Sequence, residues 1–234
     1  NLTAAGSVRT TGTARLATDV LTAAAGTWAN VRTTVTTLDL TTGAGTATVK
    51  ELDALVIQRM AVIAGNVALT IGGSTTVTGN LTATGSVTIQ SDAGVDVSGA
   101  VASGSSLLLD AVGDVTIGGL VDSVGSATLI SGGAAHVGGA IDSGADLNVN
   151  AAGDIVFGTA TSAATATLTS STGSINGTSL TADKAVLAAA TGIGDTAALA
   201  LNVSEISAAS GAGDVHIDND RPGSVLVTSL SAAQ

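Results

Sequence analysis

Few residues of this chain could bind a ligand or do chemistry, and the first to consider are two aspartates. Asp122 and Asp142 lie twenty residues apart in matching contexts, Val-Asp-Ser and Ile-Asp-Ser. In stacked parallel strands their carboxylates would lie about 5 Å apart, one strand spacing. A Ca²⁺ ion would relieve the repulsion between two such charges. We prefer the plainer interpretation, a solvated turn in which Ser123 and Ser143 supply hydrogen bonds.

A second acidic group is formed by Asp214, Asp218 and Asp220, with Asn219 between the last two. Its spacing is similar to part of a calcium loop, but the glycine and the distal glutamate of that motif are missing. The nonapeptide of calcium-binding rolls, Gly-Gly-x-Gly-x-Asp, is absent too, and a turn into residues 221–223 explains the group equally well. We therefore expect no metal and no cofactor. The calcium alternative would use Asp122, Asp142, Asp218 and Asp220.

The sequence does not predict an enzyme. His136 and His216 lie far apart and the chain has no cysteine, so a zinc site is not expected. No Gly-x-Ser-x-Gly elbow occurs with a histidine and an acid to serve it. Enzymes that cleave carbohydrates need clustered carboxylates, usually beside aromatic rings that stack on sugars. Trp28 and Phe157 are the only aromatic residues, which is too few to line such a groove.

The elements that must position these residues are defined by a repeat of about twenty residues. The cassette at 65–69 returns at 85–89 and at 125–129, and a second series half a period out of step includes 113–117 and 153–157. Each cassette is a small polar turn followed by apolar-x-apolar, the alternation of a strand. Fixed self-similarity at this period is typical of a solenoid, a propeller or an array.

Among these repeat folds, the pattern favours a parallel β-helix. A propeller blade needs about forty residues and usually aromatic signatures, and the frame of leucine-rich repeats is absent. Frequent glycine and β-branched residues oppose helices. A coil of about twenty residues with two strong strands and a short third fits a β-helix. About twelve coils would form a rod of about 55–60 Å.

Composition limits the function further. The chain has 234 residues, a formal net charge of −11, 45% apolar residues and 1% aromatic residues. This apolar fraction excludes disorder, and the small apolar side chains suit a narrow core. Seven scattered basic residues against 18 acidic ones argue against nucleic acid. No run of 18 apolar residues predicts a membrane span.

We interpret residues 1–234 as one continuous solenoid with three regions. Residues 1–60 form irregular coils, residues 61–181 form the regular array, and residues 182–234 resemble residues 17–60. The segment 194–206 matches 26–38, and 211–217 matches 43–49, both at an offset of 168 residues (194 − 26 and 211 − 43). The offset indicates a longer period above the short one, so we expect the chain to be a fragment of a longer tandem array.

Several segments resemble a known family. Residues 85–94, 113–119 and 144–155 are similar to the haemagglutinin repeats of filamentous-haemagglutinin-like exoproteins and of large bacterial adhesins. The stretch 192–227 resembles an element of giant surface proteins of that type. The resemblance implies a right-handed β-helix, secretion by a Gram-negative-type bacterium, and a place at the cell surface or outside the cell.

The sequence thus predicts a structural rod segment of a secreted surface adhesin or extracellular filament. Its expected partners are further coils of the same protein, or identical copies stacked end to end, because an open strand row is a template for pairing. The alternative is a module that binds a glycan or protein of a host or neighbouring cell through one flank. That flank would use outward residues such as Asp96, His136, Asp146 and Asn148.

Overall fold

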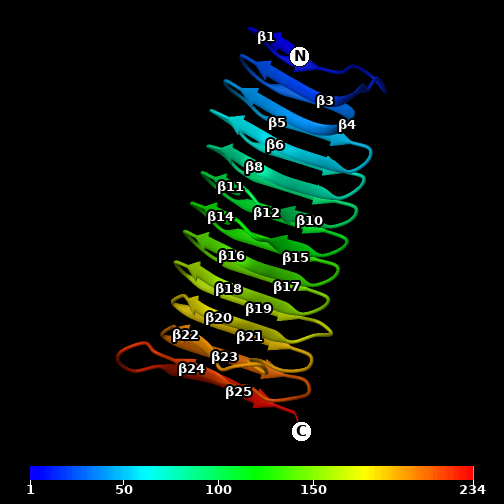
Figure 1. The fold of residues 1–234 in the computed structure, drawn as a ribbon. Coiled ribbons are helices and arrows are strands. Elements are labelled where there is room, and N and C mark those ends of the chain that lie inside the picture. Colours follow the sequence, from blue (N-terminus) through cyan, green and yellow to red (C-terminus); the bar gives the residue numbers. More distant parts are fainter. Residues whose placement is uncertain (234) are drawn as a thin grey trace.

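The computed structural model of the chain describes residues 1–233, which form strands and turns without any helix. Successive coils stack along one axis, with the two termini at opposite ends (Figure 1). All pairings between the strands are parallel, as in the central ladder that joins β10 to β8 and β13. The prediction of an all-β parallel β-helix is therefore confirmed.

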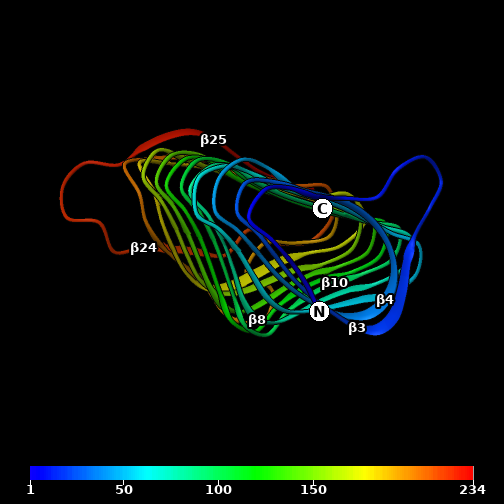
Figure 2. The same cartoon turned by 90° about the horizontal axis from the view of Figure 1, so that it is seen from above.

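Each regular coil has three sides, each formed by one strand segment. In the coil at the middle of the chain these are β10 (Val95–Val97), β11 (Ala100–Ser103) and β12 (Leu107–Ala111). Seen from above, the outline is three-sided and the coils wind in a right-handed sense (Figure 2). The expected short third strand is thus present as β11.

Side A, the longest side, carries one strand from each of twelve coils. Its strands are β2 (Val8–Arg9), the first residues of β4 (Ala29–Thr42), β5 (Ala47–Glu51), β7 (Val67–Ile71), β9 (Val87–Ser91), β12, β15 (Ala127–Ser131), β17 (Leu147–Ala151), β19 (Thr165–Ser170), β21 (Lys184–Ala189), β23 (Glu205–Ser210) and β25 (Leu226–Ala232).

Sides B and C share long strands that turn the corner between them. These are β3 (Leu16–Ala25), β4, β6 (Leu55–Val62), β8 (Thr75–Ala83), β16 (Ala135–Ser143), β18 (Ile155–Ser162) and β20 (Ile175–Thr181). Side B is completed by β10 and β13 (Val115–Ile117). Side C is completed by β1 (Leu2–Ala4), β11, β14 (Leu120–Ser123), β22 (Leu199–Asn202) and β24 (Ile217–Asn219).

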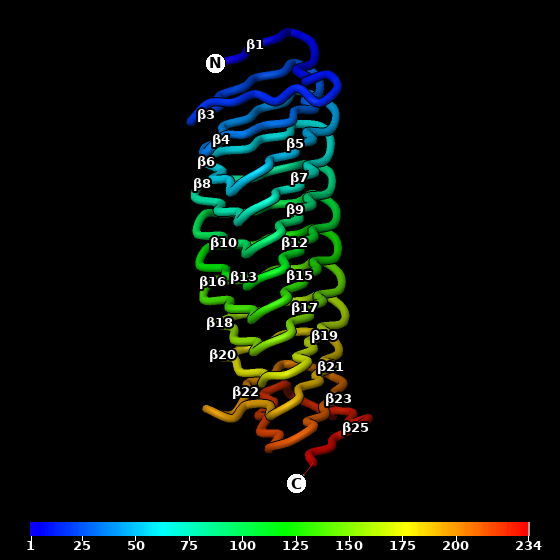
Figure 3. Tube along the Cα trace, turned by 90° about the vertical axis from the view of Figure 1, so that its right-hand side faces the viewer, coloured from blue at the N-terminus to red at the C-terminus, as the bar shows by residue number. Residues whose placement is uncertain are grey.

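The register shows how regular the stacking is. On side A, Ala47 pairs with Val67 and Val67 with Val87, and this spacing of twenty residues continues to Leu147. The next two coils are one residue shorter, since Leu147 pairs with Ala166. Equal coil lengths place like residues directly above one another, and the backbone accordingly rises in even steps from coil to coil (Figure 3).

The core is a column of small apolar side chains enclosed by the coil itself. In the coil from Val87 to Ser103, every second residue of each strand points inward and is buried. Val, Leu and Ile occupy most of these positions along the rod, including Ile57, Leu109 and Ile117, none of which has any exposed surface. Burying such side chains stabilises the fold by about 1.5–3 kcal/mol each. The predicted column of stacked aliphatic residues is present.

Buried serines fasten the turns at two corners of the rod. Ser123, on side C, is 1% exposed, and its hydroxyl lies 2.8 Å from the carbonyl oxygen of Ser105 and 3.2 Å from that of Ser126. Ser131, on side A, binds the carbonyl oxygens of Gly113 and Ala134 in the same manner. In both cases one carbonyl belongs to the preceding coil, so each hydroxyl links two coils as well as closing a turn. Other buried serines with this role are Ser91, Ser103, Ser143, Ser162 and Ser170.

The corner between sides B and C depends on a stack of glycines. A Cβ added to Gly119 would lie 1.7 Å from the carbonyl oxygen of Gly99, and one added to Gly139 would lie 1.8 Å from that of Gly119. Gly99 stands in the same relation to Gly79. Backbones approach so closely at this corner that no side chain fits.

The residues matched by the 168-residue offset do not occupy equivalent places. Val49 lies in β5 on side A, whereas Ile217, its match, lies in β24 on side C. Eight coils, from Ala47 to Ile206 on side A, take 159 residues (206 − 47). An offset of 168 exceeds these eight coils by nine residues (168 − 159), so it places the matched residues about half a coil apart around the rod.

Candidate functional site on the turns and outer faces

The two aspartates proposed as calcium ligands do lie on adjacent coils. Asp122 of β14 is the register partner of Asp142 in β16, and both side chains are exposed on side C. Ala102 precedes them in the same row and Thr161 follows. The pair therefore has no third acidic residue beside it in this row. Ser123 and Ser143 do supply hydrogen bonds to turn carbonyls, as expected. Their setting is not solvated, however, because they sit at the opposite phase of the strand and are buried inside the coil.

Residues Asp218 and Asp220 do not form a calcium loop in the structure. Both are exposed, while Asn219 between them turns inward and binds the backbone of Val203 through both amide atoms, each at 3.1 Å. Within residues 1–233, no group of three or more His, Asp or Glu side chains is placed to hold a metal ion.

Aspartates at the turns do something else, which is to fasten one coil to the next. Asp154 accepts hydrogen bonds from the backbone N–H of Ser174 at 2.7 Å and from its hydroxyl at 3.0 Å. These bonds, helped slightly by nearby His136, hold the pKa of Asp154 below its ordinary value of 3.8. Asp114 accepts from Ala134 N–H at 2.8 Å in the same way. These carboxylates are structural anchors.

The four residues proposed for flank recognition do not form one surface. Asp96 and His136 lie in one outward row of side B, two coils apart, with Thr116 between them. Asn148 lies on side A, and Asp146 lies in the turn that precedes it. A ligand that contacts all four would have to pass around a corner of the rod.

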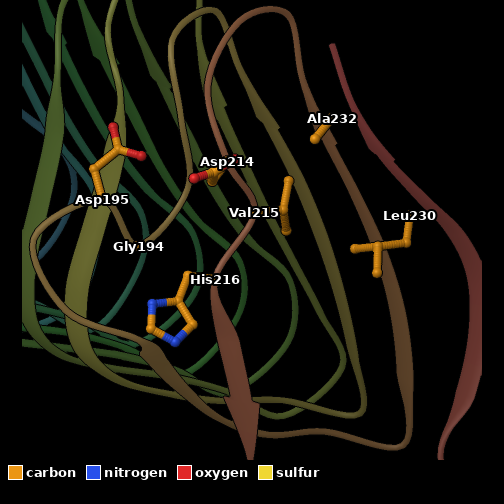
Figure 4. A pocket seen from close by; sticks show the side chains of 7 residues that line it. All are labelled: Gly194, Asp195, Asp214, Val215, His216, Leu230 and Ala232. Carbon is orange, nitrogen blue, oxygen red and sulfur yellow. The ribbon is translucent and has the colours of Figure 1, made fainter. Parts of the chain in front are cut away.

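A hollow near the carboxyl end brings together residues that the sequence did not connect. It has a volume of about 590 Å³ and is lined by Gly194, Asp195, Asp214, Val215, His216, Leu230 and Ala232 (Figure 4). His216 and both aspartates are exposed, so the hollow is an open concavity and not a dry site. Only the coordinates reveal it, because Asp195 reaches it from another coil.

A buried carboxylate in the amino-terminal coils was also missed. Glu51 is 4% exposed and ends β5 at an inward position that Ile71 occupies in the next coil. One of its oxygens accepts from Val35 N–H at 3.0 Å, and the other accepts from Leu52 N–H at 2.8 Å. Alignment of the cassettes 47–51 and 67–71 places the glutamate in the core column, and this signal would have identified it.

The core is open at the carboxyl end of the described residues. Val227 and Leu230 of β25 pair with the core residues Ile206 and Ala208, yet they are 54% and 60% exposed. Beside them a mostly apolar hollow of about 270 Å³ reaches the core. Another coil placed against β25 would cover both side chains.

The ladders, columns and turns define the class of this molecule, a parallel β-solenoid repeat protein. Comparison of the chain with protein-family models, with curated proteins and with solved structures gives no match. No helix that is long and apolar enough to cross a membrane occurs among residues 1–233.

Proposed function

We propose that the chain is a structural rod segment of a secreted bacterial surface adhesin or extracellular filament. The observation that carries this proposal is the unbroken side A, in which twelve coils continue one parallel ladder from β2 to β25. Such a ladder resists bending and stretching because every coil is bonded to both neighbours along its length. The resemblance of residues 85–94 and 113–119 to haemagglutinin repeats supports the adhesin setting.

The end of the ladder supports assembly by stacking. Val227 and Leu230 present core positions to solvent, and a strand row without a partner favours further pairing. The charges favour contact between opposite ends. Residues 1–60 carry five basic and four acidic side chains, whereas residues 182–234 carry two basic and six acidic ones. Further coils of the same polypeptide, or an identical copy, are the partners that fit this end.

Electron microscopy of the native assembly tests the rod directly. We expect straight rods whose length grows in steps of one segment, with no change in width. Particles that remain single at high concentration, from a gene without neighbouring repeats, would contradict the stacking.

The cellular setting needs its own measurement. Antibodies against the chain should label intact cells of the source bacterium and should decorate surface projections. Labelling that appears only after lysis would contradict the secreted location while leaving the rod architecture intact.

A further inference from the structure

The outer face of side A differs from the rest of the surface in having almost no net charge. From β7 to β23 eight strands each direct two side chains outward, and three of them direct a third, namely Thr165 in β19, Lys184 in β21 and Glu205 in β23. The two in each strand are Ala68, Thr70, Thr88, Gln90, Leu108, Asp110, Thr128, Ile130, Asn148, Asn150, Thr167, Thr169, Val186, Ala188, Ser207 and Ala209. Asp110 is the single ionised residue among these sixteen. Lys184 and Glu205 are ionised as well, but they form an ion pair with each other at 2.7 Å, so the outward residues of the last five strands carry no net charge.

The remaining charges of the array lie elsewhere on the rod. Residues 61–181 contain eight aspartates and no lysine or arginine. Seven of the eight are on sides B and C or at the turns, namely Asp92, Asp96, Asp114, Asp122, Asp142, Asp146 and Asp154. Two copies of this chain, each with a charge of −11, repel one another through those surfaces. Side A, with Asp110 as its one unpaired charge from β7 to β23, is the face on which they can approach with the least repulsion.

The shape of side A suits another sheet. Its strands are straight and in register, and they form the long upper edge of the outline in Figure 2. A shallow hollow of about 270 Å³ runs over β15, β17 and β19, lined by residues that include Ile130, Asn148 and Asn150. Ile130 is 37% exposed, a branched apolar side chain on an uncharged face. Threonine and asparagine around it can exchange hydrogen bonds with the same residues of a facing sheet.

The area is sufficient for a specific contact. Eight strands at about 4.8 Å, each about five residues of 3.3 Å, give about 650 Å² for one copy and about 1,300 Å² for two. Specific protein interfaces bury about 1,200–2,000 Å² in total. Because the surface is flat and has few aromatic anchors, we expect the affinity to be moderate.

We propose that side A is a contact surface between two copies of this chain, which lie side by side with these sheets face to face, about 10 Å apart. The contact is lateral, so it goes beyond end-to-end stacking and does not depend on what adjoins either end of the chain. It would bundle rods into thicker fibres.

Small-angle X-ray scattering and sedimentation over a concentration series distinguish the two geometries. Lateral pairing doubles the mass with little change in the maximum dimension, whereas stacking doubles the maximum dimension. The key variant is Ile130→Asp, which places a like charge on each facing sheet. We expect it to weaken the lateral dimer at least tenfold.

The matched control is Val156→Asp on side B. Val156 is 41% exposed, a fraction similar to that of Ile130, but its side chain lies on side B and faces away from side A. It should leave dimerisation unchanged within twofold. Circular dichroism and thermal unfolding establish that each variant folds, and Asn150→Asp on side A is the second variant should Ile130→Asp fail to fold.

Three results would overturn the proposal. The chain stays monomeric at millimolar concentration, or it associates only by lengthening, or Ile130→Asp and Val156→Asp weaken association equally. Binding of monomers to insoluble cellulose or chitin that is lost with Ile130→Asp would instead assign the face to a glycan. Association by lengthening alone would support end-to-end stacking and contradict the lateral contact. Lateral pairing without lengthening would do the reverse, so the two proposals can be tested separately.

Discussion

The regular array and the amino-terminal coils belong to the same solenoid but are held together by different contacts. In most of the array, equal coil lengths of twenty residues allow small residues to repeat, so that Gly119 stacks on Gly99 and buried serines bind turn carbonyls. Before it the coils are unequal, with steps of 21 residues from Val8 to Ala29 and 18 from Ala29 to Ala47. There β4 runs through all three sides as one strand of 14 residues.

The unequal coils rely on individual polar contacts. Glu51 is buried as a carboxylate, and Arg59 donates to both carboxylate oxygens of Asp39 at 2.8 and 3.0 Å. Within residues 1–233, the buried hydroxyls of Thr33 and Thr42 have no hydrogen-bond partner, and neither does that of Thr75 near the start of the array. The comparison teaches that strict repetition satisfies the turn carbonyls with a few recurring serines, whereas irregular coils need a separate solution at each turn.

The largest expected effect is at the glycine corner. Gly119→Ala places a methyl group 1.7 Å from the Gly99 carbonyl oxygen, so the two coils must separate locally. We expect the free energy of unfolding to fall by about 3 kcal/mol, measured by urea unfolding followed by circular dichroism. Gly118→Ala is the control, because a Cβ there would meet nothing nearer than 3.9 Å. Equal losses in both variants would show that the stack is not what requires glycine.

Glu51→Gln should have the next largest effect. The amide keeps one acceptor oxygen and turns a donor toward a backbone N–H that the carboxylate now satisfies. We expect a loss of about 2 kcal/mol, and fluorescence of Trp28, the sole tryptophan, should report it. Asp53→Asn, an exposed neighbour, should change stability by less than about 0.5 kcal/mol. If Glu51→Gln left the free energy of unfolding unchanged, the fold would not need a carboxylate at this position.

Buried hydroxyls should behave oppositely in the two regions. Ser123→Ala removes bonds to two turn carbonyls and should destabilise the array by about 1 kcal/mol. Thr42→Val removes an unpaired hydroxyl while keeping the shape, and it should stabilise the amino-terminal coils by about 1 kcal/mol. Midpoints of urea unfolding for the two variants should therefore move in opposite directions, and a shift in the same direction would contradict the contrast.

The smallest expected effect depends on pH. Because its pKa is lowered in the fold, Asp154 stabilises the array above its ordinary value of 3.8, and this contribution is lost as pH falls through the lower folded value. Asp154→Asn should therefore be less stable than the natural chain at pH 7, by under about 1 kcal/mol for an exposed carboxylate. The difference should shrink progressively as the pH falls below 3.8. Asp96→Asn serves as the control, and a gap that widens in acid would contradict the assignment.

Period and alternation were enough to predict the strands and the core. A cassette such as 85–89 begins with its own turn and alternates inward and outward residues, and a copy of it occurs one coil away. The local strand pattern and the long-range repeat therefore specify the same structure. Outside the array, the segments 15–25 and 182–190 contain strands as well, β3 and β21.

The functional residues could not be predicted as well, because their roles depend on the exact number of residues at each corner. Ser123 follows Asp122 directly, yet one is buried and the other exposed, since they occupy opposite phases of β14. The 168-residue match failed to give equivalent positions because coils of 18, 19 and 21 residues interrupt the period of twenty. Side A was likewise hidden in the sequence, because its charge-poor face appears only when alternate residues of eight strands are placed together.

The lack of lysine and arginine between Arg59 and Lys184 has a consequence for resistance to proteolysis. Trypsin-like proteases cleave after those two residues, so residues 60–184 offer them no cleavable bond even when a coil opens. Most of the rod would be released as one piece instead of being digested.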